Sequence, residues 1–491
     1  MIQYNYTIEW INKELFTVYE NFEFDKKLVK CSPTARQLAV EEMEFYAFAH
    51  FTVNTFTGRE WGDGTEDESL FNPTEFNADQ WVEALKAADI KGLILTCKHH
   101  DGFCLWPSAY TEHCVKNSPY KDGKGDIVRE VSEACAKGGI KFGVYLSPWD
   151  RNCVLYGQGE PYDDYFCNQL TELLTNYGNL FCVWFDGACG EGPNGKKQVY
   201  DWNRYYSVIR ELQPDAAISI TGPDIRWCGN EAGDTRESEW SVVSTTVTLP
   251  DEVAKNSQTS DEVSFREKKL NDTTRDLGSR NLMKHANGIK WSPCETDTSI
   301  RPGWFYHEEE DDKVKSLETL LDIWYRTVGG NSRLLLNIPP DKRGLFHETD
   351  VERLKQMGDY IRNTFAVNLA ENAIFTADKT NGYDLPENMK TDSYNTFYKP
   401  FDGDNEVIIN IKLDSPKSVS HIVIKECIPY SQRIEKYEIE ALIDGKWINL
   451  NTGTTVGYKR IAKFDPVLTD EIRIRILDSR VCPIISFIGI Y

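Results

Sequence analysis

The sequence contains no apolar run long enough to cross a bilayer, although 40% of its 491 residues are hydrophobic. A membrane-spanning helix needs about 20 consecutive apolar residues. Residues 1–6 also lack the basic segment and the apolar stretch of a secretory signal. We therefore expect no membrane association. We expect a cytoplasmic location for the chain as given, or a periplasmic or secreted one if a signal segment has been removed.

Positive charge is scarce. The chain has 55 Lys plus Arg against 77 Asp plus Glu, which gives a formal net charge of −22. A field of this sign repels nucleic acids and anionic lipid surfaces, and it favours neutral or cationic ligands. This balance excludes nucleic-acid recognition as the expected function.

The thirteen cysteines lack the spacing of a zinc site or of a disulfide framework. Their number is odd, and no CxxC pair occurs. Several of them lie in apolar runs, where a thiol behaves as a small hydrophobic group. This usage favours a reducing compartment and predicts no metal site.

The motifs of nucleotide-dependent and metal-dependent enzymes are also missing. The sequence has no Gly-rich phosphate loop, dinucleotide fingerprint, GxSxG elbow or HExxH pattern. In an extended chain the adjacent His99 and His100 point to opposite faces, so they cannot both chelate one metal from one side. Neutral imidazoles can instead bind hydroxyl groups. We expect no cofactor, and metal-dependent hydrolysis at this pair is an alternative that chelators would reveal.

What the sequence does contain is a regular alternation of strands and helices over its first three quarters. This order is typical of parallel strands joined by helical crossovers. Six strands can be assigned, and residues 241–290 are too polar for an assignment. Because a closed barrel needs eight strands, we predict an α/β fold with a (β/α)8-like TIM barrel over residues 1–365. The expected strands cover residues 45–51, 92–96, 141–147, 181–185, 217–221 and 333–338, and the expected helices cover 78–88, 126–137, 163–177, 202–212, 314–325 and 350–364.

The pattern changes after the last expected helix. Short runs with a period of two follow, separated by turn residues such as Asp444-Gly445. Such runs are typical of antiparallel sheets packed face to face. We predict an all-β sandwich over residues 366–491. Its expected strands lie at residues 407–413, 419–424, 437–442, 472–477 and 484–490.

A carboxylate follows the apolar run 181–185. Asp186 stands where this strand should end, and barrel enzymes place catalytic groups at that position. An Asp that only caps a turn is the structural alternative. Glu231 and Glu295 are possible partner acids, and spacing does not choose between them. Paired carboxylates in a pocket rich in histidine and aromatic rings, which stack on sugars, suit glycoside cleavage.

Four segments resemble the α-L-fucosidases of glycoside hydrolase family 29. They are NTFTGREWG at 54–62, TCKHHDGF at 96–103, WFDGA at 184–188 and SIRPGWFYH at 299–307. The likeness covers about residues 40–345 in the correct order. The sequence is most similar to the branch of the family that removes α-1,3/1,4-linked fucose from Lewis-type branched glycans. This branch carries the GNE-x-G loop and the SIRPGWF segment.

The resemblance implies a (β/α) barrel and a retaining mechanism without metal. Asp186 would be the nucleophile that forms a covalent fucosyl-enzyme. Glu231 would protonate the leaving oxygen and then act as the base that activates water. The partners would be fucosylated oligosaccharides or glycoconjugates. The same likeness implies that His50, Trp61, His99, His100 and Tyr145 bind fucose, and that Glu60, Arg226, Glu295 and Trp304 shape the rest of the pocket or meet the aglycone.

Alternatives remain at two levels. A sister branch carries its acid in a pattern similar to residues 233–239, so Glu239 is a rival of Glu231, and Glu295 remains a second rival. A fucosidase of broader specificity, another retaining exo-glycosidase such as one acting on galactose, and a non-catalytic glycan-binding protein are rival functions. The C-terminal part resembles a sandwich of the galactose-binding type, and we expect it to brace the barrel. The sequence predicts no oligomeric state.

Overall fold

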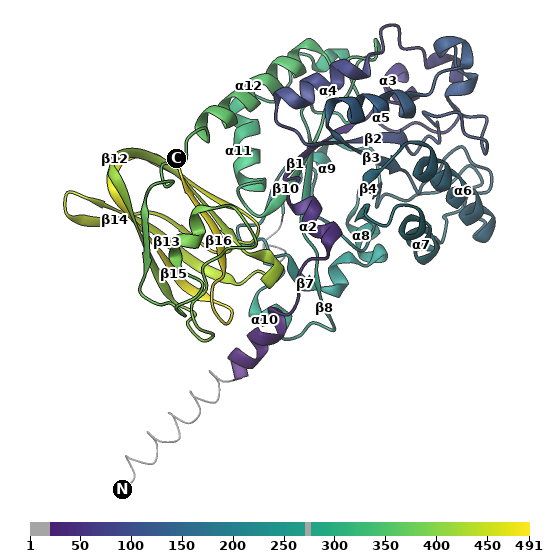
Figure 1. The fold of residues 1–491 in the computed structure, drawn as a ribbon. Helices are drawn as coiled ribbons and strands as arrows, with labels where there is room; N and C mark the ends of the chain where they lie inside the picture. Colours follow the sequence, from purple (N-terminus) through teal and green to yellow (C-terminus); the bar gives the residue numbers. More distant parts are fainter. Residues whose placement is uncertain (1–19, 271–275) are drawn as a thin grey trace.

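The computed structural model describes residues 20–270 and 276–491. A larger part, which ends with helix α12 (Glu348–Thr364), lies beside a smaller part built from the C-terminal strands (Figure 1). Residues 1–6, on which the expectation of no signal segment depends, lie outside the described residues. No helix in the described ranges is long and apolar enough to cross a membrane.

The larger part contains an eight-stranded sheet with the order β5-β4-β3-β2-β1-β10-β9-β6. Every neighbouring pair in this order runs parallel. A bridge between Ser219 and Ile225 joins its two ends, so the sheet is nearly closed. The predicted barrel class is confirmed. The strands are β1 (Phe45–Ala49), β2 (Gly92–Lys98), β3 (Lys141–Leu146), β4 (Leu180–Phe185), β5 (Ala217–Ile220), β6 (Arg226–Trp227), β9 (Cys294–Ser299) and β10 (Ser332–Asn337).

Helices surround this sheet at the positions that the sequence predicts, with ends shifted by a few residues (Figure 1). Asn77 caps the N-terminus of α4 (Ala78–Ala87), because its side chain accepts a hydrogen bond from the Gln80 N–H. Trp81 and Leu85 on the same helix are buried, and the Trp81 ring stacks on that of Phe346. Besides α12, these helices are α4 (Ala78–Ala87), α5 (Ile127–Gly138), α6 (Glu160–Asn176), α7 (Trp202–Leu212) and α11 (Leu317–Thr327); two shorter helices that the sequence did not predict, α2 (Ala35–Glu41) and α3 (Val53–Thr57), flank β1.

Two barrel strands have no signal in the hydrophobic pattern. β9 reads Cys-Glu-Thr-Asp-Thr-Ser, yet all six residues are buried. Its polar side chains are satisfied by hydrogen bonds; for example, Thr296 shares a hydrogen bond of 2.8 Å with Ser332. β6 has only two residues. A prediction from apolar periodicity cannot find either strand.

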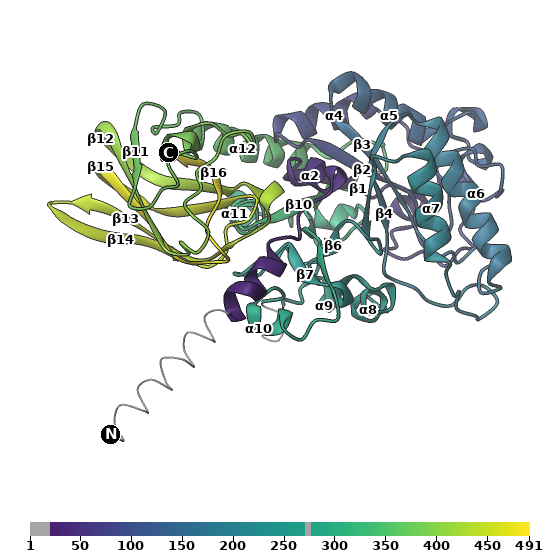
Figure 2. The ribbon, with the colours of Figure 1, turned by 60° about the horizontal axis from the view of Figure 1, so that its bottom comes forward.

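The unassigned polar region forms an excursion between β6 and β9. β7 (Val242–Ser244) pairs antiparallel with β8 (Ile289–Trp291), and short helices lie between them. Figure 2 shows these helices gathered below the strands of the barrel. The helices are α8 (Pro250–Asn256), α9 (Val263–Arg266) and α10 (Arg280–Met283).

The smaller part is an antiparallel β domain with its own apolar core, as predicted. Two expected strands, at 407–413 and 419–424, are one long strand, β12 (Val407–Glu426), with breaks in its register against β15. Such irregularities let long strands bend across both layers of a sandwich. The expected turn at Asp444-Gly445 is confirmed, since both residues have positive φ and join β13 to β14. The remaining strands are β11 (Ile374–Ala377), β13 (Ile434–Ile443), β14 (Lys446–Gly453), β15 (Arg460–Ser479) and β16 (Ile485–Ile490).

The two parts contact each other along α11 and α12 (Figure 2). The Tyr325 hydroxyl lies 2.9 Å from His421 Nε2, and the ring of Phe365 packs edge-on against Tyr491. Gly330, just before β10, forms a backbone bridge with Arg460. The β domain is therefore packed directly against the barrel.

Candidate active site

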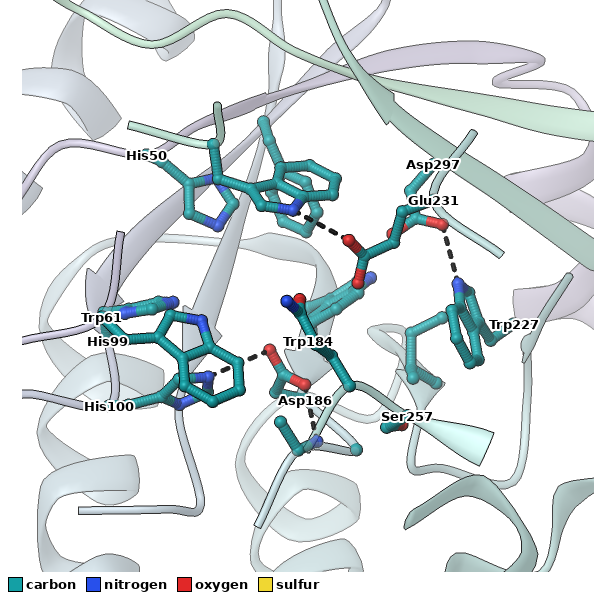
Figure 3. Close-up of a pocket in the computed structure, with 16 residues that line it drawn as sticks. His50, Trp61, His99, His100, Trp184, Asp186, Trp227, Glu231, Ser257 and Asp297 are labelled. Carbon is teal, nitrogen blue, oxygen red and sulfur yellow. Dashed lines mark hydrogen bonds and ion pairs between the residues drawn. The ribbon is translucent and has the colours of Figure 1, made fainter. Parts of the chain in front are cut away.

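A pocket of about 540 Å³ lies at the carboxyl ends of the barrel strands (Figure 3). This is the end of a parallel barrel at which catalytic groups are found. Seven of the eleven site residues predicted from the sequence line it, and nine further residues join them there, five of which carry a polar side-chain group. The seven are His50, Trp61, His99, His100, Asp186, Glu231 and Trp304; the five are Trp184, Trp227, Ser257, Gln258 and Asp297, and the other four are Phe48, Gly187, Ala188 and Ile220.

Asp186 follows β4 directly and is held by two donors. Its Oδ1 accepts the Ala188 N–H at 2.7 Å, and its Oδ2 accepts the Tyr145 hydroxyl at 2.8 Å. Burial raises the pKa of Asp186 above its ordinary value, and these two hydrogen bonds act in the opposite direction because they favour the carboxylate. Tyr145 itself lies beneath the pocket, where its ring stacks on Trp184. The site thus fixes one carboxylate with its oxygens toward the cavity.

Glu231 lies across the cavity from Asp186, on the loop that follows β6 (Figure 3). Its Oε2 accepts a single indole hydrogen bond, from Trp304 Nε1 at 3.0 Å. Burial raises the pKa of Glu231 to about 7; the Trp304 hydrogen bond opposes this shift, and the negative charge of Asp186 adds to it. Two carboxyl groups with different surroundings therefore face one pocket, and the second of them keeps its proton up to about neutral pH.

His50 presents an acceptor to the pocket. Its Nδ1 lies 2.8 Å from Asn337 Oδ1, while the Asn337 amide group donates to Ser299 Oγ and to the Trp304 carbonyl. This network assigns the proton of His50 to Nδ1. Burial lowers the pKa of His50 to about 4, so the ring is neutral at pH 7. Its Nε2 lone pair is then available to a hydroxyl group.

His100 has the same tautomer for a similar reason. The Ser147 hydroxyl donates to the Trp149 carbonyl at 2.6 Å, so it accepts from His100 Nδ1 at 2.8 Å. Burial lowers the pKa of His100 to about 3. Its Nε2 lies 3.8 Å from Asp186 Oδ2, and both atoms are acceptors. A substrate hydroxyl near these two atoms can donate to either.

The expectation that His99 and His100 point to opposite faces is wrong. β2 ends at Lys98, so the two histidines lie in the turn after the strand, and their ring centroids are 4.1 Å apart. Both rings therefore line the same pocket. The alternation of side chains holds only while the chain stays extended.

Aromatic rings form the walls of the pocket. Trp61 packs edge-on against His100, and Phe48 packs edge-on against Trp184 at 4.9 Å. Trp304 lies 5.2 Å from the ring of His50. Apolar walls of this kind, interrupted by a few polar atoms, fit the mixed faces of a sugar ring.

Glu60 does not line the pocket but holds one of its walls. Its carboxylate accepts the N–H groups of Trp304 at 2.7 Å and Phe305 at 3.1 Å. It also pairs with Arg266 on α9 and with His307, each at 2.7 Å. Although burial acts to raise the pKa of Glu60, these partners lower it below its ordinary value. Glu60 therefore stabilises the segment that carries Trp304.

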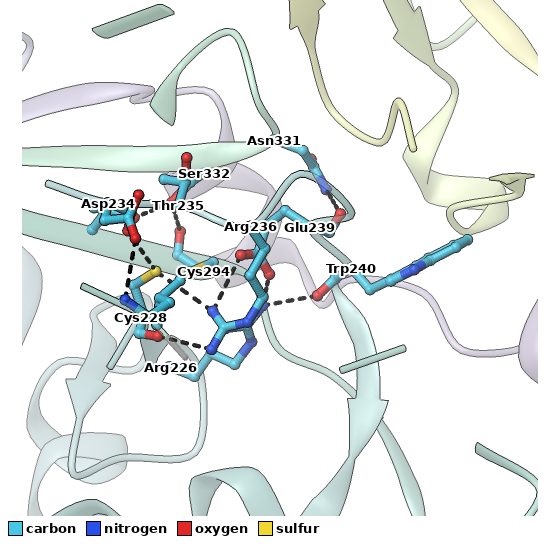
Figure 4. A network of polar contacts seen from close by, with 12 residues as sticks. Arg226, Cys228, Asp234, Thr235, Arg236, Glu239, Trp240, Cys294, Asn331 and Ser332 are labelled. Carbon is cyan, nitrogen blue, oxygen red and sulfur yellow. Dashed lines mark hydrogen bonds and ion pairs between the residues drawn. The ribbon is translucent and has the colours of Figure 1, made fainter. Parts of the chain in front are cut away.

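Arg226 and Glu239 are also outside the pocket lining. Glu239 is fully buried, and its two carboxylate oxygens pair with Arg226 and Arg236 (Figure 4). Arg236 also donates to the Cys228 carbonyl at 2.9 Å, at the start of the loop that leads to Glu231. A carboxylate held by two arginines has no free oxygen for a substrate. The network instead fixes the base of the Glu231 loop.

The β domain contacts the same segment. Gln432 donates to the Glu239 carbonyl at 2.9 Å, and Arg460 donates to the Glu237 carbonyl at 2.9 Å. The guanidinium of Arg480 lies 3.7 Å from the ring centroid of Trp240. These contacts support the bracing role expected from the sequence, because they hold the segment that positions Glu239.

Glu295 lies below the pocket on β9, where it accepts hydrogen bonds from Tyr46 and from Trp184 Nε1. Asp297, two residues later, lines the cavity instead. Successive residues of a strand alternate between its faces, so both acids point inward, and Asp297 is nearer the carboxyl end. This rule would have selected Asp297 over Glu295 if β9 had been recognised as a strand.

The sequence contains weaker indications, or none, for the other polar lining residues that were not predicted. Trp184 precedes Asp186 by two residues and shares its strand. Trp227 belongs to the two-residue strand β6. Ser257 and Gln258 follow α8, in the region without hydrophobic periodicity, and no pattern in the sequence marks them.

One group in the described ranges has the spacing of a metal site: Cys228, Glu239 and Cys294, whose ligand atoms lie within 4.8 Å of one another. A cation there would face Arg226 and Arg236, which already occupy the Glu239 carboxylate. This donor set does not fit a metal ion. The group is better described as a buried polar network (Figure 4).

Removal of the Glu239 charge should destabilise the protein strongly. Glu239→Gln leaves two buried guanidinium groups without their anion, which costs about 3–5 kcal/mol of the free energy of unfolding. Denaturant unfolding followed by circular dichroism measures this loss. The exposed neighbour Glu237 is the matched control, and Glu237→Gln should change stability by less than about 0.5 kcal/mol. Equal stability of the two variants would contradict the role of Glu239 as the anion that neutralises Arg226 and Arg236.

Comparison with known proteins gives one consistent result. Residues 34–364 match the family model of the α-L-fucosidases. Alpha-L-fucosidase 1 of Arabidopsis thaliana is 37% identical over 467 residues, which cover 94% of this chain and 87% of that protein. A solved structure from Bacteroides ovatus is 46% identical, covers 95% of this chain and 76% of its own, and has a TM-score of 0.81. A GH29 fucosidase of Ruminococcus gnavus, solved in complex with fucose, is 32% identical with a TM-score of 0.81 and covers 94% of this chain and 95% of its own. The chain therefore belongs to the α-L-fucosidases, family 29 of the glycoside hydrolases.

Proposed function

We propose that this enzyme is a retaining exo-α-L-fucosidase that cleaves α-1,3/1,4-linked fucose from Lewis-type branched oligosaccharides. The observation that carries the mechanism is the pair of carboxyl groups in one pocket. Asp186 accepts two hydrogen bonds that favour its ionised form, whereas Glu231 is buried with a single indole donor. This difference suits a nucleophile and an acid, respectively.

Hydrolysis then proceeds in two displacements. The Asp186 carboxylate attacks the anomeric carbon of fucose while Glu231 gives its proton to the leaving oxygen, which forms a covalent fucosyl-enzyme. Glu231, now ionised, takes a proton from a water molecule while the water oxygen attacks the same carbon, and the bond to Asp186 breaks. Two inversions give net retention, so nuclear magnetic resonance of early product should detect the α anomer of fucose first. A β anomer as first product would contradict the mechanism.

The pocket supports removal of a single terminal sugar. Its aromatic walls are interrupted by neutral histidines, as the mixed faces of one sugar ring require. The His50 and His100 Nε2 atoms can accept hydrogen bonds from ring hydroxyls. Asp186 Oδ2 lies 3.8 Å from His100 Nε2, next to these acceptors. A terminal fucose bound there would present its anomeric carbon between the two carboxyl groups.

The linkage preference is supported by the GNE-x-G loop at 229–233 and by the SIRPGWF segment at 299–305. The experiment measures fucose released from a Lewis-type trisaccharide, an α-1,2-fucosylated glycan and an aryl fucoside. Release mainly from the Lewis sugar would support the proposed branch. Good turnover of all three substrates would contradict this branch assignment and indicate a fucosidase of broader specificity. No release from any of them, together with turnover of a galactoside or with binding alone, would favour another exo-glycosidase or a glycan-binding protein.

Activity should fall on both sides of a pH optimum. Because burial raises the pKa of Glu231 to about 7, the acid loses its proton and cleavage slows as pH rises through about 7. Burial also raises the pKa of Asp186, so the nucleophile becomes protonated, and activity is lost, at a higher pH than for an exposed aspartate. The pH dependence of kcat/KM on the Lewis-type trisaccharide measures both limbs. A profile that stays flat through neutral pH would contradict these roles.

A further inference from the structure

The excursion between β7 and β8 reaches the catalytic pocket through a chain of hydrogen bonds. Arg266, the last residue of α9, donates from Nη1 to Glu60 Oε2 at 2.7 Å. The same Oε2 accepts the Trp304 N–H at 2.7 Å. Trp304 Nε1 in turn donates to Glu231 Oε2 at 3.0 Å. Three short contacts therefore connect α9 with the carboxyl group proposed as the general acid.

The backbone of Trp304 is held on both sides. Glu60 accepts its N–H, and Asn337 Nδ2 donates to its carbonyl at 2.8 Å. Gly303 allows the carboxylate to approach this closely, because a Cβ at that position would lie 2.5 Å from Glu60 Oε1. The direction in which the Trp304 indole N–H points toward Glu231 therefore depends on Glu60.

Glu60 needs a permanent cation beside it. Its side chain is only 9% exposed, and a buried carboxylate is stable only when it is paired. His307 Nε2 lies 2.7 Å from Oε1, but an imidazole gains and loses its charge near neutral pH, whereas an arginine stays charged. The only other anion that pairs with Arg266 in the described ranges is Asp261, at 3.8 Å. Arg266 is therefore the constant counter-charge of Glu60.

α9 has a second anchor at the pocket. Phe265, next to Arg266, stacks on Trp227 with ring centroids 6.5 Å apart and planes 16° from parallel. Trp227 lines the cavity, and so do Ser257 and Gln258, which follow α8. These contacts should keep α9 in place when Arg266 is replaced, so the ion pair with Glu60 can be removed by itself.

We propose that Arg266 is a positioning residue: its ion pair with Glu60 holds Trp304 in place, and Trp304 aligns the general acid with the leaving oxygen. This role rests on the proposed function, because it concerns Glu231 in the same reaction. A segment outside the regular barrel thereby takes part in the placement of a catalytic group. Arg266 itself does not line the pocket.

The first test compares two leaving groups. In Arg266→Met, kcat/KM on the Lewis-type trisaccharide should fall by about 10- to 100-fold, because a misplaced acid protonates the leaving oxygen poorly. An aryl fucoside with an acidic phenol leaves without a proton, so its kcat/KM should change much less. Arg266→Lys keeps the positive charge and should recover part of the loss on the trisaccharide.

Lys269→Met is the matched control. It removes one positive charge from the exposed side of the same segment, so both substrates should be cleaved as by the wild type. Equal losses on the two substrates in Arg266→Met would mean that Arg266 only supports the fold, and would overturn the positioning role. Unchanged cleavage of the trisaccharide would overturn it as well.

The indole N–H of Trp304 separates this inference from the proposed function. In protein isotopically labelled at the tryptophan nitrogens, its magnetic resonance signal is identified by its loss in Trp304→Phe. The signal should follow the titration of Glu231 in the wild type and should no longer do so in Arg266→Met. The same response in both proteins would overturn the inference. A wild type that shows the response but releases no fucose from any substrate would overturn the proposed function alone.

Discussion

Replacement of Asp186 by alanine should lower kcat by roughly 10⁴- to 10⁶-fold, the range seen when a catalytic nucleophile or an essential partner is removed from an enzyme. No other carboxylate in the pocket can substitute for it. Glu231 is on the opposite side of the cavity, and Asp297 is behind Glu231 and tied to Trp227 (Figure 3). Without Asp186 the covalent intermediate cannot form.

The loss should be confined to catalysis. The Asp186 side chain accepts hydrogen bonds from the Ala188 N–H and the Tyr145 hydroxyl and anchors none of the aromatic walls, so its removal should leave those walls and the histidines in place. Calorimetry should therefore detect binding of the Lewis-type glycan to the variant, and thermal unfolding should stay close to that of the wild type. A glycan-binding protein would show no turnover in the wild type either, which distinguishes the two functions.

Two further measurements examine the same residue. Tyr145→Phe removes one donor to Asp186 and keeps the carboxylate, so it should lower kcat far less than Asp186→Ala does. A small anion such as azide can enter the space vacated in Asp186→Ala and attack the anomeric carbon directly. The product should be a fucosyl azide of inverted configuration. Retained activity without any added anion would contradict Asp186 as nucleophile.

The sequence predicts those parts of the fold that depend on apolar burial. Residues 181–185 are hydrophobic because β4 is buried on both faces, and Asp186 follows at the point where the strand leaves the core. β9 is equally buried, but its side chains are satisfied by hydrogen bonds instead of apolar contacts. Its position depends on partners far away in the sequence, such as Ser332, and a local pattern cannot reveal them.

The residues of the active site can likewise be divided into those that the sequence locates and those that it does not. Segments that follow recognisable strands, with His99, His100 and Asp186, could be located from the sequence and from the family resemblance. The resemblance implies that Glu60 shapes the pocket, but neither source could supply the way it does so, because its contacts depend on Trp304, Arg266 and His307 being folded around it. Ser257 and Gln258 reach the pocket only through the excursion between β7 and β8.

Glu231→Gln should lower kcat/KM for the Lewis-type glycan by about 10²- to 10⁴-fold, the usual contribution of a general acid or base. A glycan oxygen is a poor leaving group and needs the Glu231 proton as the bond breaks. An aryl fucoside with an acidic phenol leaves without that proton, so formation of its fucosyl-enzyme should be much less affected. Because Gln cannot activate water, the intermediate should accumulate, and a burst of phenol should precede slow turnover.

The alkaline limb of the pH profile should disappear in the same variant, since the group that titrates near neutrality has been removed. Glu239→Gln and Glu295→Gln are the necessary comparisons, because both residues were rivals of Glu231 in the sequence. Both are buried, and their oxygens are occupied by Arg226 and Arg236 or by Tyr46 and Trp184. In these two variants kcat/KM should fall only in proportion to the fraction of enzyme that is folded. The fall should therefore be similar for the Lewis-type glycan and the aryl fucoside. A glycan-specific loss in either of them, with Glu231→Gln close to wild type, would transfer the acid to that residue.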